Sequence, residues 1–244
     1  MTLVTLPPST GAARSIDRHA TAPILVATDL HKRFGATEAL RGIDFQLLPG
    51  EIVAIMGPSG SGKSTLLHCL AGILLPDRGA VSFDGRRIDA MGESERSRLR
   101  RTAFGFVFQF GQLVPELTAL ENVALPLLLG DEGRRSAEQR AAEWFPRLGL
   151  SGLEHHRPGD MSGGQAQRVA VARALVSGPA VIFADEPTGS LDSLAGEQVM
   201  ELLTGAAREA AASIVIVTHE ARVAAYAQRE VIVRDGCTSG AVPG

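Results

Sequence analysis

The sequence contains few cysteines and few lysines. The scarcity of cysteine argues against metal-binding and disulfide-stabilised classes of protein, and the scarcity of lysine makes each lysine notable. Only two cysteines, Cys69 and Cys237, occur in 244 residues. They lie far apart and without metal-ligand spacing, so neither a zinc site nor a disulfide framework is predicted, and a reducing compartment suits the chain. Lysine occurs only at positions 32 and 63 among 24 basic residues, which draws attention to Lys63.

The chain also has no excess of basic residues and no long apolar run. Its formal net charge is −3, so no nucleic-acid partner is expected. No apolar stretch approaches the roughly 18 residues that span a bilayer, which predicts a soluble or peripheral protein. Residues 1–22 lack the pattern of a signal peptide and are rich in Pro, Ser, Thr and Ala. We expect flexible tails at 1–22 and 240–244.

Apolar patterns separated by Gly and Pro predict strands that alternate with helices. The predicted strands are 24–28, 43–47, 52–56, 81–83, 104–108, 181–184, 214–217 and 231–233. The predicted helices are 63–71, 118–129, 137–148, 162–177 and 194–211. This alternation predicts a mainly parallel sheet. The helices within about 110–177 predict a helical subdomain between two parts of one core domain, 23–109 and 178–239.

A glycine-rich loop directly follows the buried strand predicted at 52–56. It reads Gly57-Pro58-Ser59-Gly60-Ser61-Gly62-Lys63-Ser64 and fits G-x-x-x-x-G-K-[ST] in the required order of strand, loop and helix. Its glycines allow successive backbone N–H groups to point at phosphates. We expect Lys63 to reach the β- and γ-phosphates, Ser64 to hold Mg²⁺, and Thr65 to contact the α-phosphate.

Two adjacent carboxylates, Asp185 and Glu186, end the strand predicted at 181–184. Ligands of α/β folds bind at such strand ends. Asp185 is predicted to hold Mg²⁺, usually through water, while Glu186 points to the opposite side and orients or deprotonates the attacking water. An isolated Asp-Glu pair is more often a solvated strand exit, but the apolar strand and the phosphate loop favour the functional interpretation.

A second candidate anion site lies between these motifs, at Ser162-Gly163-Gly164-Gln165. These residues open a predicted helix, and they offer backbone N–H groups and a hydroxyl to an anion. The anion that we expect there is a γ-phosphate held by another copy of the chain.

The order of these three motifs resembles the ATP-binding cassette (ABC) family of ATPases, over about residues 24–236. The resemblance implies an α/β fold of the P-loop NTPase type, with a mainly parallel core sheet, an N-terminal antiparallel β part and an inserted α-helical subdomain. It implies ATP and Mg²⁺ as ligands, ATP hydrolysis as the activity, and a second copy of the ATPase subunit as an ATP-dependent partner. Met161 replaces the family's usual leucine, which is a change of similar volume.

The resemblance also assigns roles to residues that carry no signal alone. Gln109 occupies the place of a glutamine that touches Mg²⁺ and the attacking water. His219 matches the switch histidine that hydrogen-bonds the γ-phosphate, although an isolated histidine there would more often be solvated. Asp192 lies in the loop through which two copies communicate, and Phe34 takes the place of the aromatic residue stacked on adenine.

Segments 106–110 and 113–123 resemble the lipoprotein-release and macrolide-export branch of the family, whose membrane partner is a separate polypeptide. The resemblance implies a transmembrane permease subunit as partner, and a cytoplasmic chain that is peripheral on the inner face of the cell membrane. Four apolar residues either line a groove for a permease helix or pack within the helical subdomain. They are Phe110, Leu113, Val114 and Leu117. The charge run at 93–101 is predicted to be a solvated helix face.

The favoured function is therefore the ATPase subunit of a membrane transporter or membrane-remodelling complex. A non-transport ABC ATPase, acting on ribosomes, DNA or cofactor assembly, is the alternative from another class. The single cassette without a heptad run does not favour it, because such relatives carry two cassettes or long coiled coils. A cell-division regulator built on the same ATPase and permease plan also stays open, as do the cargo and its direction.

Overall fold

The computed structural model describes residues 22–239, so nearly all of both predicted tails lies outside the described residues. The strands are β1 (Leu25–Phe34), β2 (Thr37–Leu47), β3 (Ile52–Met56), β4 (Arg78–Phe83), β5 (Arg86–Arg87), β6 (Phe104–Phe108), β7 (Val181–Asp185), β8 (Ser213–Thr218), β9 (Arg229–Arg234) and β10 (Cys237–Ser239). The helices are α1 (Lys63–Leu70), α2 (Glu93–Thr102), α3 (Ala119–Leu129), α4 (Arg134–Ala142), α5 (Trp144–Arg147), α6 (Gly163–Leu175), α7 (Ser193–Glu209) and α8 (Ala221–Ala224). A 3₁₀ turn spans Pro158–Asp160.

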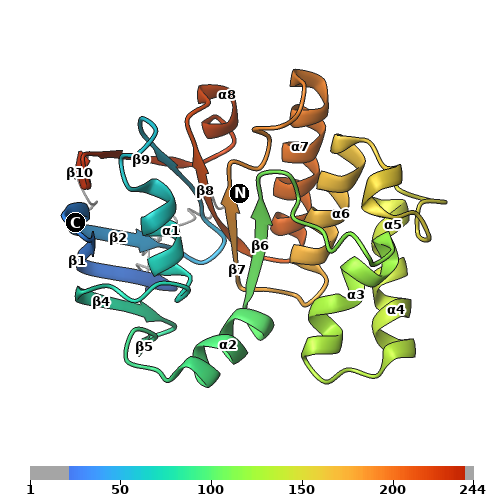
Figure 1. Ribbon diagram of the computed structural model, residues 1–244, viewed down its shortest axis with the longest axis horizontal. Helices are drawn as coiled ribbons and strands as arrows, with labels where there is room; N and C mark the ends of the chain where they lie inside the picture. The colour runs from blue at the N-terminus through green and yellow to red at the C-terminus, as the bar shows by residue number, and fades with distance from the viewer. Residues whose placement is uncertain (1–21, 240–244) are drawn as a thin grey trace, which may run out of the picture.

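Two sheets organise the molecule. A six-stranded sheet has the order β10-β9-β3-β8-β7-β6, and a four-stranded sheet has the order β2-β1-β4-β5. The strands from β9 to β6 run parallel, whereas β10 and the smaller sheet are antiparallel. Figure 1 shows the smaller sheet at one end of the molecule and helices α3 to α6 at the other. The predicted fold class is thereby confirmed.

The central strands are buried on both faces, as their unbroken apolar runs require. In β8 the alternate residues Ile214 and Ile216 pack into the core beneath the helical end. Val215 and Val217 point the other way, into the core shared with α1 and the smaller sheet. Because complete burial of one such side chain contributes about 1.5–3 kcal/mol, this period of two fixes which face each residue occupies.

Two expectations about helices have different outcomes. The charge run folds as α2, where Glu93 forms ion pairs with Arg96 and Arg100. The helix carries mixed charge as predicted, but its face is not wholly solvated, because Arg96 is buried. The single helix predicted at 137–148 is wrong, because α4 ends at Ala142 and a separate turn, α5, begins at Trp144. Within residues 22–239, no helix has the length and apolarity needed to cross a membrane.

Candidate nucleotide-binding and catalytic site

The glycine-rich loop joins β3 to α1 and is pressed against neighbouring backbone. A Cβ atom on Gly57 would lie 2.0 Å from the Val233 carbonyl oxygen, and one on Gly62 would lie 2.3 Å from that of Ala39. No side chain tolerates such distances, so both positions require glycine. The first turn of α1 contains no acidic residue, so its positive end stays available to an anion.

Lys63 is folded back over this loop. Its side chain is buried, and its Nζ donates to the Gly57 and Pro58 carbonyl oxygens, both at 2.9 Å. An ammonium group has three donor hydrogens, so these two bonds leave one for a phosphate oxygen. The loop thus holds a cation above the anion-binding end of α1.

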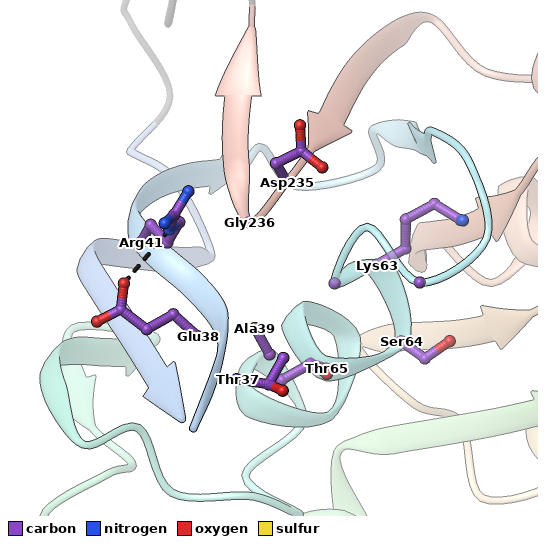
Figure 2. A pocket seen from close by; sticks show the side chains of 11 residues that line it. Thr37, Glu38, Ala39, Arg41, Lys63, Ser64, Thr65, Asp235 and Gly236 are labelled. Atoms are coloured by element: carbon purple, nitrogen blue, oxygen red, sulfur yellow. Dashed lines mark hydrogen bonds and ion pairs between the residues drawn. The ribbon is translucent and has the colours of Figure 1, made fainter. Parts of the chain in front are cut away.

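A cavity of about 550 Å³ lies beside the loop, and Figure 2 shows the side chains around it. From the loop and α1 it is lined by Gly60, Gly62, Lys63, Ser64 and Thr65. The opposite wall comes from β2 and the turn after β9, and sequence reasoning missed it: Thr37, Glu38, Ala39, Arg41, Asp235 and Gly236. Phe34 lies outside this lining, half exposed, with the Lys32 ammonium 5.7 Å from its ring centroid.

Asp185 meets the loop from the end of β7. Its Oδ1 accepts a hydrogen bond from the Ser64 hydroxyl at 3.2 Å. Burial raises the pKa of Asp185, and the Ser64 hydrogen bond opposes that shift. Mg²⁺ prefers oxygen ligands and is usually held by one or two protein groups together with phosphates. The paired hydroxyl and carboxylate fit such an ion, whose charge would keep Asp185 ionised.

Glu186 follows in an unusual backbone conformation. Its φ angle is 47°, in the left-handed region, which costs a side-chain-bearing residue about 1–3 kcal/mol. One carboxylate oxygen, Oε1, lies 2.8 Å from His219 Nδ1, and the other, Oε2, accepts from the Thr218 hydroxyl at 3.3 Å. The hydrogen bond to Glu186 raises the pKa of His219. Sequence reasoning named Glu186 and His219 but missed Thr218.

Gln109 directly follows β6 and lies against the loop beyond Glu186. A Cβ atom on Gly189 would be 2.8 Å from the Gln109 Nε2 atom, so the amide packs directly on that glycine. Two residues of α6, the buried Gln167 and the half-buried Arg173, brace the surrounding backbone. Gln167 Nε2 donates to the Phe108 and Pro187 carbonyl oxygens at 3.0 and 2.7 Å. Arg173 donates to the carbonyl oxygens of Gly111 at 2.7 Å and Gln112 at 2.9 Å.

The Ser162-Gly163-Gly164-Gln165 turn forms a capping box at the start of α6. Ser162 Oγ accepts from the Gln165 backbone N–H at 3.2 Å, and Gln165 Oε1 accepts from the Ser162 N–H at 2.8 Å. The N–H groups of Gly163 and Gly164 have no acceptor within the helix and are available to an anion. Asp192 caps α7 by accepting from the Ala195 N–H at 2.9 Å.

This turn does not join the cavity beside Lys63. None of the residues that line the cavity belongs to Ser162–Gln165. In Figure 1, α6 lies apart from α1, with β6 and β7 between them in this view. The start of α6 instead lies against the loop before α7 and the first turn of α7, because Cβ atoms on Gly163 and Gly164 would lie 3.4 Å from Leu191 and 3.3 Å from Ala195. One chain therefore carries two separate candidate phosphate sites.

The strand, glycine-rich loop and lysine, with a carboxylate at the end of β7 on the far side of β8, define a P-loop nucleoside triphosphatase. The sequence profile of the family described as ABC transporter matches residues 40–189. The chain belongs to that family, and it is an ATP-binding ATPase.

Several characterised proteins are similar to it. LolD 2 of Caulobacter vibrioides, a lipoprotein-releasing system ATP-binding protein, is 44% identical over 88% of this chain and 96% of the relative. The macrolide export ATP-binding/permease protein MacB of Marinobacter nauticus is 45% identical over 88% of this chain, which spans 34% of MacB. The cassette MJ0796, solved as a dimer bound to ADP and Pi, has a TM-score of 0.81 and 38% identity over 88% of this chain and 97% of its own.

Replacing Lys63 with Ala is expected to weaken ATP binding at least about tenfold, because a hydrogen bond from a charged donor is lost. Hydrolysis should fall with it. Isothermal titration and phosphate release on the purified chain measure both. Arg98→Ala, which removes an exposed cation from α2, is the control and should match the wild type. Normal affinity and turnover in Lys63→Ala would refute the assignment of the loop.

Proposed function

We propose that this chain is the ATPase subunit of a transporter of the lipoprotein-release or macrolide-export type, and that it works as a pair of copies around two ATP molecules. The observation that supports the pair is the separation of two phosphate sites on one chain. Lys63 and Asp185 lie at one, while Ser162–Gln165 lies outside that cavity. A second copy that presents its Ser162–Gln165 turn to the γ-phosphate would complete each site.

The proposed roles follow from the contacts of each group. Nucleotide contacts are assigned to Phe34, to Gly57-Pro58-Ser59-Gly60-Ser61-Gly62-Lys63-Ser64 with Thr65, to Gln109, Asp185 and His219, and across the interface to Ser162, Gly163, Gly164, Gln165 and Asp192. Ser64, Gln109 and Asp185 would hold Mg²⁺. When bound, that ion would neutralise charge on the phosphates.

Glu186 is the group we assign to the chemical step. Its carboxylate orients the attacking water and accepts its proton as the water oxygen bonds to the γ-phosphorus. The bond from that phosphorus to the bridging oxygen of ADP breaks, which releases ADP and inorganic phosphate. Lys63 and the N–H groups of the loop stabilise the negative charge on the phosphate oxygens. In the same bound state, His219 contacts the γ-phosphate, and Gln109 contacts the attacking water.

The partner of this pair is proposed to be a transmembrane permease that binds a groove between the core sheet and the helical end. The groove has a volume of about 400 Å³. Its apolar side chains are Ile73, Phe104, Phe106, Phe108, Leu125, Pro126 and Leu129, and its rim includes Arg100, Arg101 and Arg173. Docking there would place the chain on the cytoplasmic face of the inner membrane. A permease bound there would contact both the core domain, 23–109 and 178–239, and the helical subdomain, 110–177.

The four apolar residues named from the sequence do not line this groove. Leu113 packs against the helical core, as the packing interpretation expects. The backbone of Val114 is held by the buried Asn122 side chain, which donates to its carbonyl oxygen at 3.0 Å and accepts from its N–H at 2.8 Å. Phe110 is 70% exposed. Residues of β6 and α3 supply the groove instead, so the substitution that tests docking belongs on α3.

Ser162→Arg is expected to leave ATP affinity of the isolated chain near the wild-type value while lowering hydrolysis about a hundredfold, the typical cost of losing one anion-stabilising donor. The reason is that Ser162 serves the nucleotide of the other copy. Titration of the monomer and phosphate release at high protein concentration give the two values.

Ser94→Arg, at an exposed serine that also lies near the start of a helix, is the control and should keep both values. Collapse of monomer affinity in Ser162→Arg would contradict a role across the interface.

Leu129→Glu is expected to abolish binding of the permease, because the new carboxylate would lose its hydrating water within a largely apolar contact. Leu129 is 55% exposed, so the isolated chain should still fold and hydrolyse ATP. The measurement is co-purification after co-expression with a candidate permease of the lipoprotein-release or macrolide-export type. Leu48→Glu, at an exposed leucine after β2, should co-purify normally. Retention of the permease by Leu129→Glu would remove the groove from the docking site.

A further inference from the structure

The carboxylate of Glu186 is held at both of its oxygens by two very different neighbours. His219 contacts Oε1 at 2.8 Å, but its side chain is 61% exposed and lies beyond the end of β8. Thr218 contacts Oε2 at 3.3 Å and is 0% exposed. The two contacts therefore differ in exposure: one partner is at the surface, and the other is buried at the end of β8 within the sheet.

The surroundings of Thr218 fix the direction of its hydroxyl hydrogen. The Glu220 backbone N–H donates to Thr218 Oγ1 at 3.1 Å, which occupies an acceptor site of that oxygen. A hydroxyl has a single hydrogen to donate, and an ionised carboxylate can only accept. The hydrogen of Thr218 is thus directed at Glu186. Pairing of Thr218 with Met56 of β3 holds the threonine backbone in the sheet.

The backbone of Glu186 is anchored, but its carboxylate needs a further contact to hold its direction. Its left-handed φ of 47° sends the chain out of β7, and its N–H bonds to the Val217 carbonyl oxygen at 2.9 Å. This anchor fixes the Cα position next to Thr218, but several rotatable bonds still separate the carboxylate from it. A fixed donor at Oε2 removes much of that freedom.

We propose that Thr218 is a positioning residue that keeps the Glu186 carboxylate aimed at the attacking water when His219 turns towards a phosphate. This inference rests on the role proposed above for Glu186. Thr218 itself touches neither nucleotide nor water; it acts through Glu186. His219 can leave Oε1 because it is exposed, whereas the buried hydroxyl remains at Oε2 throughout the cycle.

Thr218→Val tests this inference, because valine keeps the shape of threonine and removes its hydroxyl. We expect kcat for ATP hydrolysis to fall about tenfold or more, the size of a hydrogen bond to a charged group, with KM for ATP and nucleotide affinity unchanged. Thr218→Ser keeps the hydroxyl and should restore kcat to within about threefold of wild type. If the valine variant does not fold, Thr218→Ala replaces it in the same comparison.

Thr204→Val is the matched control, because Thr204 is equally buried and its hydroxyl donates to the Met200 carbonyl oxygen within α7. It should retain wild-type kcat. Wild-type kcat in Thr218→Val, or a serine variant as impaired as the valine variant, would overturn the inference.

Glu186→Gln distinguishes failure of the positioning role of Thr218 from failure of the proposed hydrolysis mechanism. If Glu186→Gln loses turnover while Thr218→Val keeps it, only the positioning role is wrong. If Glu186→Gln itself keeps turnover, the assigned role of Glu186 fails, and the positioning role fails with it.

Discussion

The parallel register of β3, β8 and β7 is the constraint on which the rest of the site depends. Met56 pairs with Thr218, and Val217 pairs with Asp185, so the three strands end at one edge of the sheet. Each strand places a different functional group at that edge. The glycine-rich loop follows β3, the carboxylates lie at the end of β7, and His219 follows β8. A slip of one residue in either pairing would turn these groups to the wrong face and open the Ser64 to Asp185 contact.

Helix α6 is a second constraint, because it connects the site for the other copy's phosphate to the segment around Gln109. Its first turn presents the candidate site for the other copy's phosphate, while Gln167 and Arg173 on its body hold the backbone on either side of Gln109. Phe108, one of those backbone positions, also lines the groove proposed for the permease. A shift of α6 would therefore move the partner-facing turn, the Gln109 segment and the groove together, through hydrogen bonds rather than through a flexible linker.

The sequence predicted those parts of the site that depend on local pattern, and missed those that depend on distant contacts. The glycine-rich loop, Asp185, Glu186 and the Ser162 turn were accessible because each is a short motif at the end of a predicted strand or helix. Thr37, Arg41 and Asp235 line the cavity only because β2 and the turn after β9 pack against the loop, and no local pattern signals that. Thr218 directly follows the strand predicted at 214–217 and carries no signal of its own until its hydroxyl is seen at Glu186. The break at Glu143 was missed because the apolar periodicity continues across it.

Closure of two copies around ATP is the step by which we propose that hydrolysis moves a membrane partner. Light scattering on Glu186→Gln measures it directly, since this variant keeps the side-chain shape while removing the charge to which we assign activation of the water. With ATP, intact γ-phosphates should hold each Ser162–Gln165 turn across the interface, and the mass should be twice that of one chain. With ADP the mass should return to that of a single chain. The same mass under both conditions would contradict closure driven by ATP.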